Sequence, residues 1–571
     1  MRTLCLLLCL LCFSGMVRSQ IPATVTAPEE PGFDTVYTHG AVPTVRGKLL
    51  GVDPEALKDL KISYSVVTPF PEMQVRKATA ANADGSFALQ LDYALPYQQI
   101  WISVGDYFYT GVYASKDLYL ELDMKKIMAA KGVTFNGDGV RYLGTDGPLT
   151  TYVNNYILYR RDDQLRLYDE MSKLGYSNSG NRDSALSAYA VFYDSLKMIQ
   201  DGFIAANPSP YGWILENERM SEYYGHVCVL YWYNTMGDSL WQKVRQHKAF
   251  LVSNSGAGFY SYLRTYISTM PGDQKPFGWK EVEKLPNLSV AEKALVDSLM
   301  AGDKMQPAPP YTLENLNRWA KSLSPRANDV MALDNMDRAI HRVDSLFPPA
   351  KADFLKLGLI GTKDPLMQKV AHEHILQTMQ TNWCVSVERN EYGKAIEKVE
   401  EINKTLAEAT TAQKGPVSFG KPLLETKFGA SLYVASDIKA TDFLVGLKKR
   451  FPGKAIIIDL WATWCGACLG EMQHSKDLQE VSGDLPVVFV YLCTVNGSSE
   501  QKWKEKVAEL KQPGVHILID NALDAELAHY FSFSGYPGHA FIDKTGQYRP
   551  GALTWMSEIG NKKGLVALLD K

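Results

Sequence analysis

Cys465 and Cys468 are the side chains whose type and spacing most directly suggest chemistry. They follow the apolar run 455–460, which is typical of a buried parallel strand, and they open the next expected helix. The N-terminus of a helix offers unpaired N–H groups and a partial positive charge, and both stabilise a thiolate. Because the thiolate attacks disulfides, this placement predicts thiol–disulfide exchange, with Cys465 as nucleophile and Cys468 as resolving thiol.

Half of a zinc site is the competing interpretation of this pair, because structural zinc is often held by cysteines at the same spacing. Beyond residues 1–19, the sequence has no second Cys-x-x-Cys and no histidine pair at finger-like spacing. His372 and His374 are two residues apart, so a helix would direct them to different faces. We therefore expect no metal, and no cofactor beyond the redox-active disulfide Cys465-Cys468. Three further histidines have no nucleophile partner and are interpreted as structural: His226, His529 and His539.

Alternating strands and helices are expected around the cysteine pair, which indicates an α/β domain built on one sheet. Apolar runs typical of strands occupy 431–434, 455–460, 486–492, 515–519 and 540–543. Helices are expected directly after the cysteine pair and at 440–450, 499–511, 522–531 and 558–570.

Two different patterns precede this region. Alternating runs separated by Asp and Gly turns predict an antiparallel β-sandwich over 35–125. From 145 to 413 the apolar period becomes helical, which predicts an all-α domain. The expected fold class is therefore multidomain α+β, ending in an α/β domain. The many Tyr and Trp residues of the helical region are typical of a core, with a peptide- or glycan-binding groove as the alternative.

The segment around the cysteine pair resembles the active site of the thioredoxin superfamily. The family pattern is a strand ending in Asp, then aromatic-Trp-Ala-x-Trp-Cys-Gly-x-Cys, with Leu460 here replacing the aromatic residue. Seven residues match it: Asp459, Trp461, Ala462, Trp464, Cys465, Gly466 and Cys468. The resemblance covers residues 420–571 and implies a thioredoxin-like fold there.

The resemblance also implies roles for residues outside the pair. Asp459 aligns with a buried Asp of raised pKa, which relays a proton as Cys468 becomes a thiolate. Pro537 is implied to be a cis proline lying against the sulfurs, with the Tyr536 backbone offered to a substrate strand. Gly538-His539 departs from the usual Thr-containing pair. The implied substrate-binding residues are Trp464, Tyr536, Gly466 and Ala467.

Within the superfamily, the Glu471-Met472 step after the pair is similar to exported TlpA/ResA-type disulfide reductases, although Gln473 replaces the usual Pro. The layout of the preceding domains is similar to that of long TlpA-like proteins of Bacteroidetes. These resemblances imply a reductase of exported proteins that is regenerated by a membrane electron donor. Gly466-Ala467 does not decide the redox direction, so a disulfide oxidase or isomerase stays open. A partner- or glycan-binding module with an accessory thioredoxin domain is the other alternative.

The N-terminus predicts export. Residues 1–19 have the basic start, apolar run and small-residue end of a secretory signal peptide. Cys12 suggests a lipoprotein, but Leu10-Leu11 precede it where a small residue is wanted. We therefore expect a periplasmic or otherwise exported protein, and no later run is long enough for a membrane span. Removal of the signal leaves three cysteines besides the pair, interpreted as buried packing residues: Cys228, Cys384 and Cys493.

Charge gives no indication of a nucleic-acid partner. The 60 basic and 63 acidic side chains leave a net charge of −3. A nucleic-acid-binding surface requires a basic excess or a clustered basic stripe, and the Lys-rich stretches here are short. The expected partners are therefore the thiols and disulfides of exported proteins.

Overall fold

The computed structural model describes residues 41–570, except 96, 131–133, 135, 178–180, 249–251, 271–289, 304–323, 363, 412–417 and 484. The predicted signal peptide, residues 1–19, lies outside the described residues. The chain forms two compact units. The first contains residues up to 274 together with 336–361 and 372–391, and the second contains 275–335, 362–371 and 392–571.

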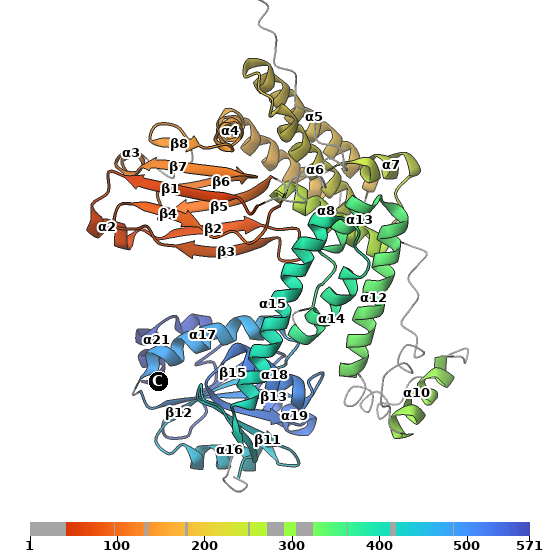
Figure 1. The fold of residues 1–571 in the computed structure, drawn as a ribbon. Coiled ribbons are helices and arrows are strands. Elements are labelled where there is room, and N and C mark those ends of the chain that lie inside the picture. Colours follow the sequence, from red (N-terminus) through yellow and green to blue (C-terminus); the bar gives the residue numbers. More distant parts are fainter. Residues whose placement is uncertain are drawn as a thin grey trace, which may run out of the picture. The chain divides into compact units, whose positions relative to one another are not determined.

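The first unit begins with two four-stranded sheets (Figure 1). The first sheet has the order β4-β1-β7-β8, with β4 Ser86–Leu89, β1 Thr44–Leu50, β7 Asp117–Asp123 and β8 Val140–Leu143. The second has the order β3-β2-β5-β6, with β3 Gln74–Thr79, β2 Ile62–Val67, β5 Gln98–Val104 and β6 Phe108–Ala114. Two short helices accompany the sheets, α2 Pro54–Asp59 and α3 Met124–Ala129.

The β-sandwich prediction needs two corrections. β1 and β7 pair in parallel, so the sandwich is not purely antiparallel. The chain returns to β7 only after passing through the second sheet, and this long excursion allows parallel pairing. The first sheet also extends beyond residue 125, because β8 pairs with β7.

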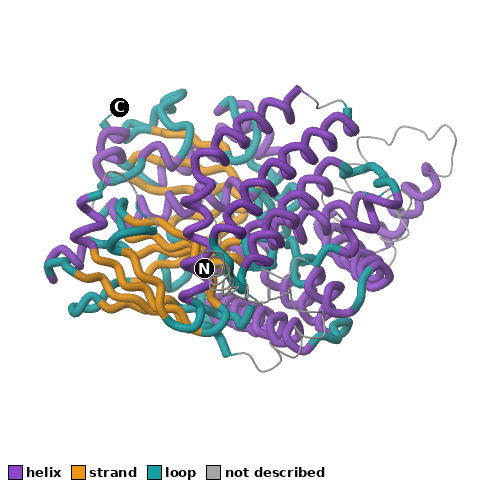
Figure 2. The backbone as a smooth tube through the Cα atoms, turned by 90° about the horizontal axis from the view of Figure 1, so that it is seen from above, coloured by secondary structure: helices purple, strands orange, loops and turns teal. Residues whose placement is uncertain are grey.

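Helices follow the sheets, and Figure 2 distinguishes the helical and strand segments of the chain. Those of the first unit are α4 Gly147–Ser177, α5 Arg182–Ala206, α6 Gly212–Leu230, α7 Asp238–Gln246, α8 Asn254–Thr269 and α13 Pro349–Lys356. Three helices have residues in both units, α12 Ser324–Leu346, α14 Pro365–Leu376 and α15 Asn382–Ala407, and α10 Val290–Asp303 belongs to the second.

Aromatic residues of the helical region pack mainly as a core, as predicted. The rings of Tyr260 and Phe354 lie 4.3 Å apart between centroids, and both side chains are buried. Cys228 and Cys384 are buried in the same core, as expected. Tyr233 is an exception, with 70% of its surface exposed.

The second unit contains a seven-stranded sheet with the order β15-β12-β13-β14-β11-β10-β9. Its strands are β9 Thr410–Thr411, β10 Lys421–Glu425, β11 Ala430–Ala435, β12 Ala455–Trp461, β13 Val487–Thr494, β14 Gly514–Ile519 and β15 Gly538–Ile542. Strands β12, β13, β14 and β11 run parallel, whereas β15 is antiparallel to β12. All seven residues of β12 are buried, as a strand covered on both faces requires.

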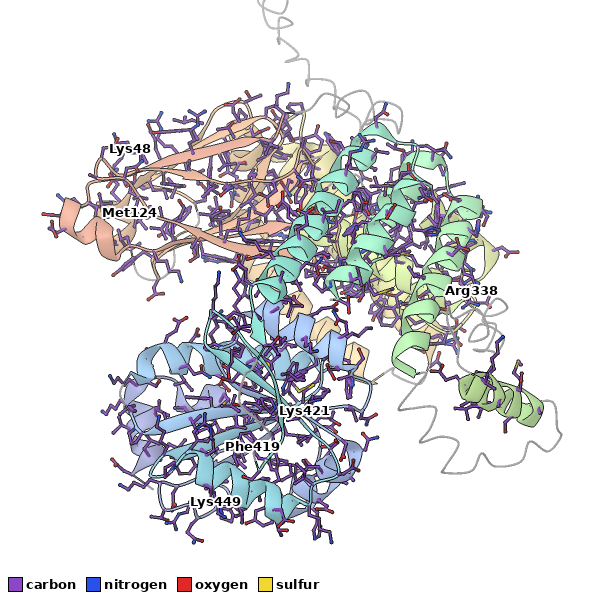
Figure 3. The ribbon with its side chains drawn as sticks, turned by 60° about the horizontal axis from the view of Figure 1, so that its bottom comes forward. Lys48, Met124, Arg338, Phe419, Lys421 and Lys449 are labelled. Atoms are coloured by element: carbon purple, nitrogen blue, oxygen red, sulfur yellow. A yellow bond between two sulfur atoms is a disulfide. The ribbon has the colours of Figure 1, made fainter. Side chains whose placement is uncertain are left out.

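Helices cover both faces of this sheet and make two cores. One core contains Trp461, both cysteines of the pair and residues of α17 Gly466–Ser482, α18 Glu500–Leu510, α20 Met556–Ile559 and α21 Lys562–Leu569. The other contains residues of α16 Ala440–Arg450 and α19 Asn521–Phe531. In Figure 3, Phe419 points into the body of this unit and Lys449 lies at its surface. The expected α/β region is confirmed, with β12 delivering the cysteine pair to the start of α17.

Candidate active site

Cys465 and Cys468 form a disulfide at the start of α17, with their Cα atoms 5.3 Å apart. Cys465 is the N-cap residue, and its sulfur accepts a hydrogen bond from the Cys468 amide at 3.1 Å. The same amide and the positive end of the helix would stabilise a thiolate on Cys465 after reduction. Cys465 is 6% exposed and Cys468 is 0% exposed. Gly466 and Ala467 are exposed, so attack from solvent is open toward the first cysteine.

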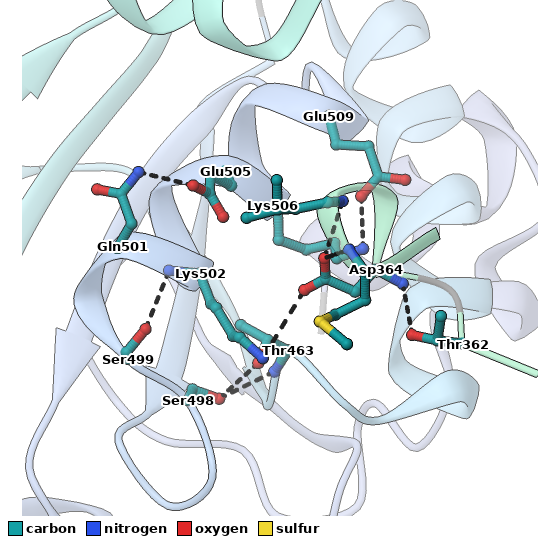
Figure 4. Close-up of polar contacts among 12 residues, drawn as sticks. Thr362, Asp364, Thr463, Ser498, Ser499, Gln501, Lys502, Glu505, Lys506 and Glu509 are labelled. Carbon is teal, nitrogen blue, oxygen red and sulfur yellow. Dashed lines mark hydrogen bonds and ion pairs between the residues drawn. The ribbon is translucent and has the colours of Figure 1, made fainter. Parts of the chain in front are cut away.

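The loop after β13 holds the residues just before the pair. The amide and hydroxyl of Thr463 both donate to Ser498 Oγ, at 3.1 and 2.9 Å (Figure 4). Ser499 caps the following helix α18, and Lys502 on that helix lies 3.8 Å from Asp364. These contacts anchor the cysteine loop to α18 within the second unit.

Trp464 is fixed in an exposed position beside the pair. Its side chain is 57% exposed, and its indole N–H donates to the Asn496 carbonyl oxygen at 2.8 Å. The next residue, Gly497, has φ +69°, and a Cβ there would lie 2.6 Å from the indole nitrogen. Gly497 is therefore required both by its own backbone and by the ring of Trp464.

The Tyr536-Pro537 peptide bond is cis, as the family resemblance implied. The ring of Tyr536 meets that of Trp464 edge to face at 5.8 Å, so the proline loop and the cysteine loop are in contact. The Tyr536 hydroxyl donates to Asp524 of α19, which fixes the proline loop to that helix. A cavity of about 500 Å³ beside the loop is lined by residues between 531–540 and 548–555. The position of Pro537 against the sulfurs stays a prediction.

Asp459 is a buried acid on the same sheet face as the cysteine core. Ile457, Asp459 and Trp461 are every second residue of β12, so their side chains point to the same face of the sheet. Ile457 and Trp461 belong to the core that contains the cysteine pair. Burial raises the pKa of Asp459 to about 6, and the charge of Glu471 adds to the increase. The electrostatic effect of His539 opposes this increase in the pKa of Asp459. The raised pKa expected for this acid is confirmed.

His539 is a site residue that the sequence interpretation missed. It stands opposite Asp459 in the antiparallel β12–β15 register, with its Nε2 3.6 Å from Asp459 Oδ1. Its Nδ1 lies 2.8 Å from the Thr554 carbonyl oxygen. Because a carbonyl oxygen only accepts, Nδ1 carries the proton, and Nε2 faces the acid. Both Asp459 oxygens and His539 Nε2 are buried without a hydrogen-bond partner.

Glu471 and Cys493 complete the surroundings of the site. Glu471 is half-buried and accepts a hydrogen bond from the Ser557 amide at 3.1 Å, which ties α17 to the start of α20. Cys493 is buried and unpaired on β13, as expected. No group of three metal-ligating side chains occurs in the part of the chain that the structure describes. His372 instead contacts the buried Glu388 at 2.6 Å in the first unit.

Comparison with known proteins matches residues 431–549 to the Redoxin family model. Among solved structures, the chain is 29% identical to a Bacteroides vulgatus protein assigned as a thiol-disulfide oxidoreductase, covering 19% of this chain and 69% of that chain, with a TM-score of 0.17. A lipoprotein thioredoxin of Streptococcus pneumoniae is 24% identical, with 22% and 89% covered and a TM-score of 0.18. A thioredoxin-family protein of Chlorobium tepidum is 13% identical, with 28% and 99% covered and a TM-score of 0.20. No curated protein matches the sequence.

Replacing Gly497 with alanine is expected to displace Trp464, because the new Cβ would overlap the indole nitrogen. The ¹⁹F spectrum of protein labelled with 5-fluorotryptophan reports this, with the Trp464 signal assigned from Trp464→Phe. Gly453→Ala is the matched control, because Gly453 has φ +73° and no atom within 4 Å of the added Cβ. Both variants lose about 1–2 kcal/mol from left-handed backbone strain, but only Gly497→Ala shifts the Trp464 signal. Equal spectra would contradict the anchoring role of the loop.

Proposed function

We propose, from the premise that the C-terminal region of this chain belongs to the thioredoxin superfamily, that the protein is an exported thiol–disulfide oxidoreductase that reduces disulfides of exported proteins. The observation that carries the proposal is the hydrogen bond from the Cys468 amide to the sulfur of Cys465 at the start of α17. This geometry stabilises a reactive thiolate on the first cysteine and keeps the second within reach of it.

The reaction runs through two exchanges. The Cys465 thiolate attacks one sulfur of a substrate disulfide, and the other substrate sulfur leaves as a thiolate that takes a proton. The Cys468 thiolate then attacks the Cys465 sulfur of the mixed disulfide and releases the second substrate thiol. Two electrons have passed to the substrate, and Cys465-Cys468 is oxidised. A membrane electron donor then returns the pair to its dithiol form.

Substrate docks on the surface formed by the cysteine and proline loops. The exposed Trp464 ring supplies an apolar platform, and Gly466 and Ala467 leave the approach to the sulfur unobstructed. The cis bond before Pro537 presents the Tyr536 backbone as a short strand edge for an extended peptide. The cavity beside the proline loop accommodates flanking substrate side chains.

Asp459 accepts the proton that Cys468 loses, and His539 assists it. Cys468 is fully buried, so its thiol needs a local base before it can attack. The Asp459 carboxylate takes this proton, and His539 Nε2, 3.6 Å away, shares it. His539 acts through Asp459 and is a positioning residue.

Export is part of the proposal and is supported by the signal-peptide pattern of residues 1–19. Among the described helices, none combines the length and the apolar character needed to cross a membrane.

Cys468→Ser should trap substrate on the enzyme, because the first exchange proceeds and the second cannot. We expect the reduced variant to form a disulfide-linked adduct with a disulfide-bonded test substrate such as native insulin, seen on non-reducing gels. Cys465→Ser should give no adduct. Cys493→Ser is the control and should turn over normally, since that thiol is buried and unpaired. An adduct of equal yield in the Cys465 variant would refute the assigned order of attack.

The pH dependence of the second exchange should report Asp459. Stopped-flow reaction of the reduced protein with 5,5′-dithiobis(2-nitrobenzoate) releases one thionitrobenzoate on Cys465 attack and a second when Cys468 resolves. The second rate should rise with pH through about 6, because the acid must ionise to accept the proton. Asp459→Asn should slow it by about 10²-fold and remove this rise.

His539→Leu should move the rise in the second rate to higher pH, because the ring of His539 opposes the increase in the pKa of Asp459. The first thionitrobenzoate release is the internal reference. His529→Gln, at an exposed position of α19, is the control and should leave both phases unchanged. An unshifted second phase in His539→Leu would exclude proton sharing between the two side chains.

The redox direction is tested by the reduction potential of the pair, measured by equilibration with glutathione or dithiothreitol. A reductase should equilibrate near thioredoxin, at about −270 mV. A value near that of strong oxidants, about −120 mV, would instead identify a disulfide oxidase or isomerase.

A further inference from the structure

The first unit contains a cavity of about 280 Å³ between its second sheet and its helices. Strands β5 and β6 contribute to its wall, together with helices α4, α5 and α6 and the start of α8. A second cavity of about 430 Å³ in the same unit shares three lining residues with it, Glu222, Asn254 and Ser255. The two cavities therefore adjoin.

Three N–H donors that line the smaller cavity are buried without a hydrogen-bond partner. They are Trp101 Nε1, Arg160 Nε and Gln200 Nε2. Gln200 is 1% exposed, and its amide oxygen accepts from Arg219 Nε at 2.9 Å. This bond fixes the amide orientation and leaves the amide nitrogen as the unsatisfied group. Buried donors normally have partners, so three in one cavity indicate a missing acceptor.

Aromatic and aliphatic side chains form part of the wall around these donors. The guanidinium of Arg160 lies over the ring of Tyr156, 4.8 Å from its centroid. Trp101 stacks on Tyr109 at 5.4 Å, which fixes the orientation of its indole N–H. Aliphatic side chains of α4, α5 and α6 also line the cavity: Val153, Ile157, Leu196 and Leu215.

Two acids line the cavity, Glu218 and Glu222, and Oε1 of Glu218 is buried without a hydrogen-bond partner. Burial raises the pKa of Glu218 to about 7; hydrogen bonds from Ser253 and Ser255 oppose the increase, Glu222 adds to it and Arg160 opposes it. Near neutral pH a large fraction of this carboxyl is therefore protonated. In that form it is a further donor, whereas its ionised form repels an anion.

We propose that this cavity binds a small monocarboxylate with an apolar body, whose carboxylate accepts the N–H groups of Trp101, Arg160 and Gln200. A carboxylate offers several acceptor sites and no donor, which fits a set of unsatisfied N–H groups. The aromatic and aliphatic walls hold the body. A dianionic phosphate is disfavoured by the two acids in the lining, Glu218 and Glu222. This site is separate from disulfide exchange.

Isothermal titration of the full-length protein with phenylacetate tests the proposal, with phenyl phosphate and glucose as comparison ligands. Phenylacetate should bind with one-to-one stoichiometry and more tightly than either comparison ligand. Gln200→Leu and Trp101→Phe should each weaken it about tenfold, because each removes one donor to a charged group while keeping the bulk of the side chain. Gln90→Leu, at an exposed position, is the matched control and should bind as wild type.

The affinity for phenylacetate should fall as the pH rises from 6 to 8, because Glu218 ionises beside the bound anion, and Glu218→Gln should remove this dependence. If a variant does not fold, the ¹⁹F signal of 5-fluorotryptophan at position 101 in the otherwise wild-type protein should still shift on titration with phenylacetate. Absence of both heat and signal shift, tighter binding of phenyl phosphate or glucose, or unchanged binding by both donor variants would overturn the proposal. Disulfide exchange by Cys465 is measured separately, and its outcome does not depend on this site.

Discussion

The hydrogen bond from the Cys468 amide to the Cys465 sulfur joins the fold to the chemistry of this protein. It forms because the buried strand β12 ends shortly before α17 begins, which places Cys465 at the N-cap of that helix. The first-turn amides of a helix have no partner within the helix, so a sulfur at the N-cap satisfies one of them. The same placement favours the thiolate electrostatically. The sheet, the loop after β13 and the proline loop all serve to keep this junction in place and accessible.

Burial of charge is the second constraint on the site. Asp459 and His539 are both withdrawn from water, and neither side chain finds a full set of partners. Such a pair contributes little net stability, because desolvation offsets much of the attraction between the two groups. Its retention beside a buried thiol is understandable if the pair holds a mobile proton. The hydrogen bond from His539 Nδ1 to the Thr554 carbonyl oxygen orients the imidazole ring so that Nε2 faces Asp459.

Local pattern predicted much of the second unit but not its long-range pairings. The apolar run at 455–460 and the cysteines after it specify a strand and a helix start by short-range physics alone, and both are confirmed. His539 was missed because its importance depends on β15 pairing antiparallel to β12 in one register, and no local pattern encodes that register. The parallel pairing of β1 and β7 was missed for the same reason. The contact of Glu471 with the Ser557 amide, 86 positions away, is likewise beyond any local pattern.

The three unsatisfied N–H donors of the first unit carry a free-energy cost. Each buried N–H without an acceptor costs about 1–3 kcal/mol, so three of them would be a considerable burden on a domain that served only as a spacer. Gln200 also accepts from Arg219, so an apolar replacement would remove one unsatisfied donor and leave Arg219 Nε without this acceptor. The observed set is better explained by an occupant that completes it. On that proposal, binding of a small carboxylate by the first unit and disulfide exchange by the second would be separable by mutation.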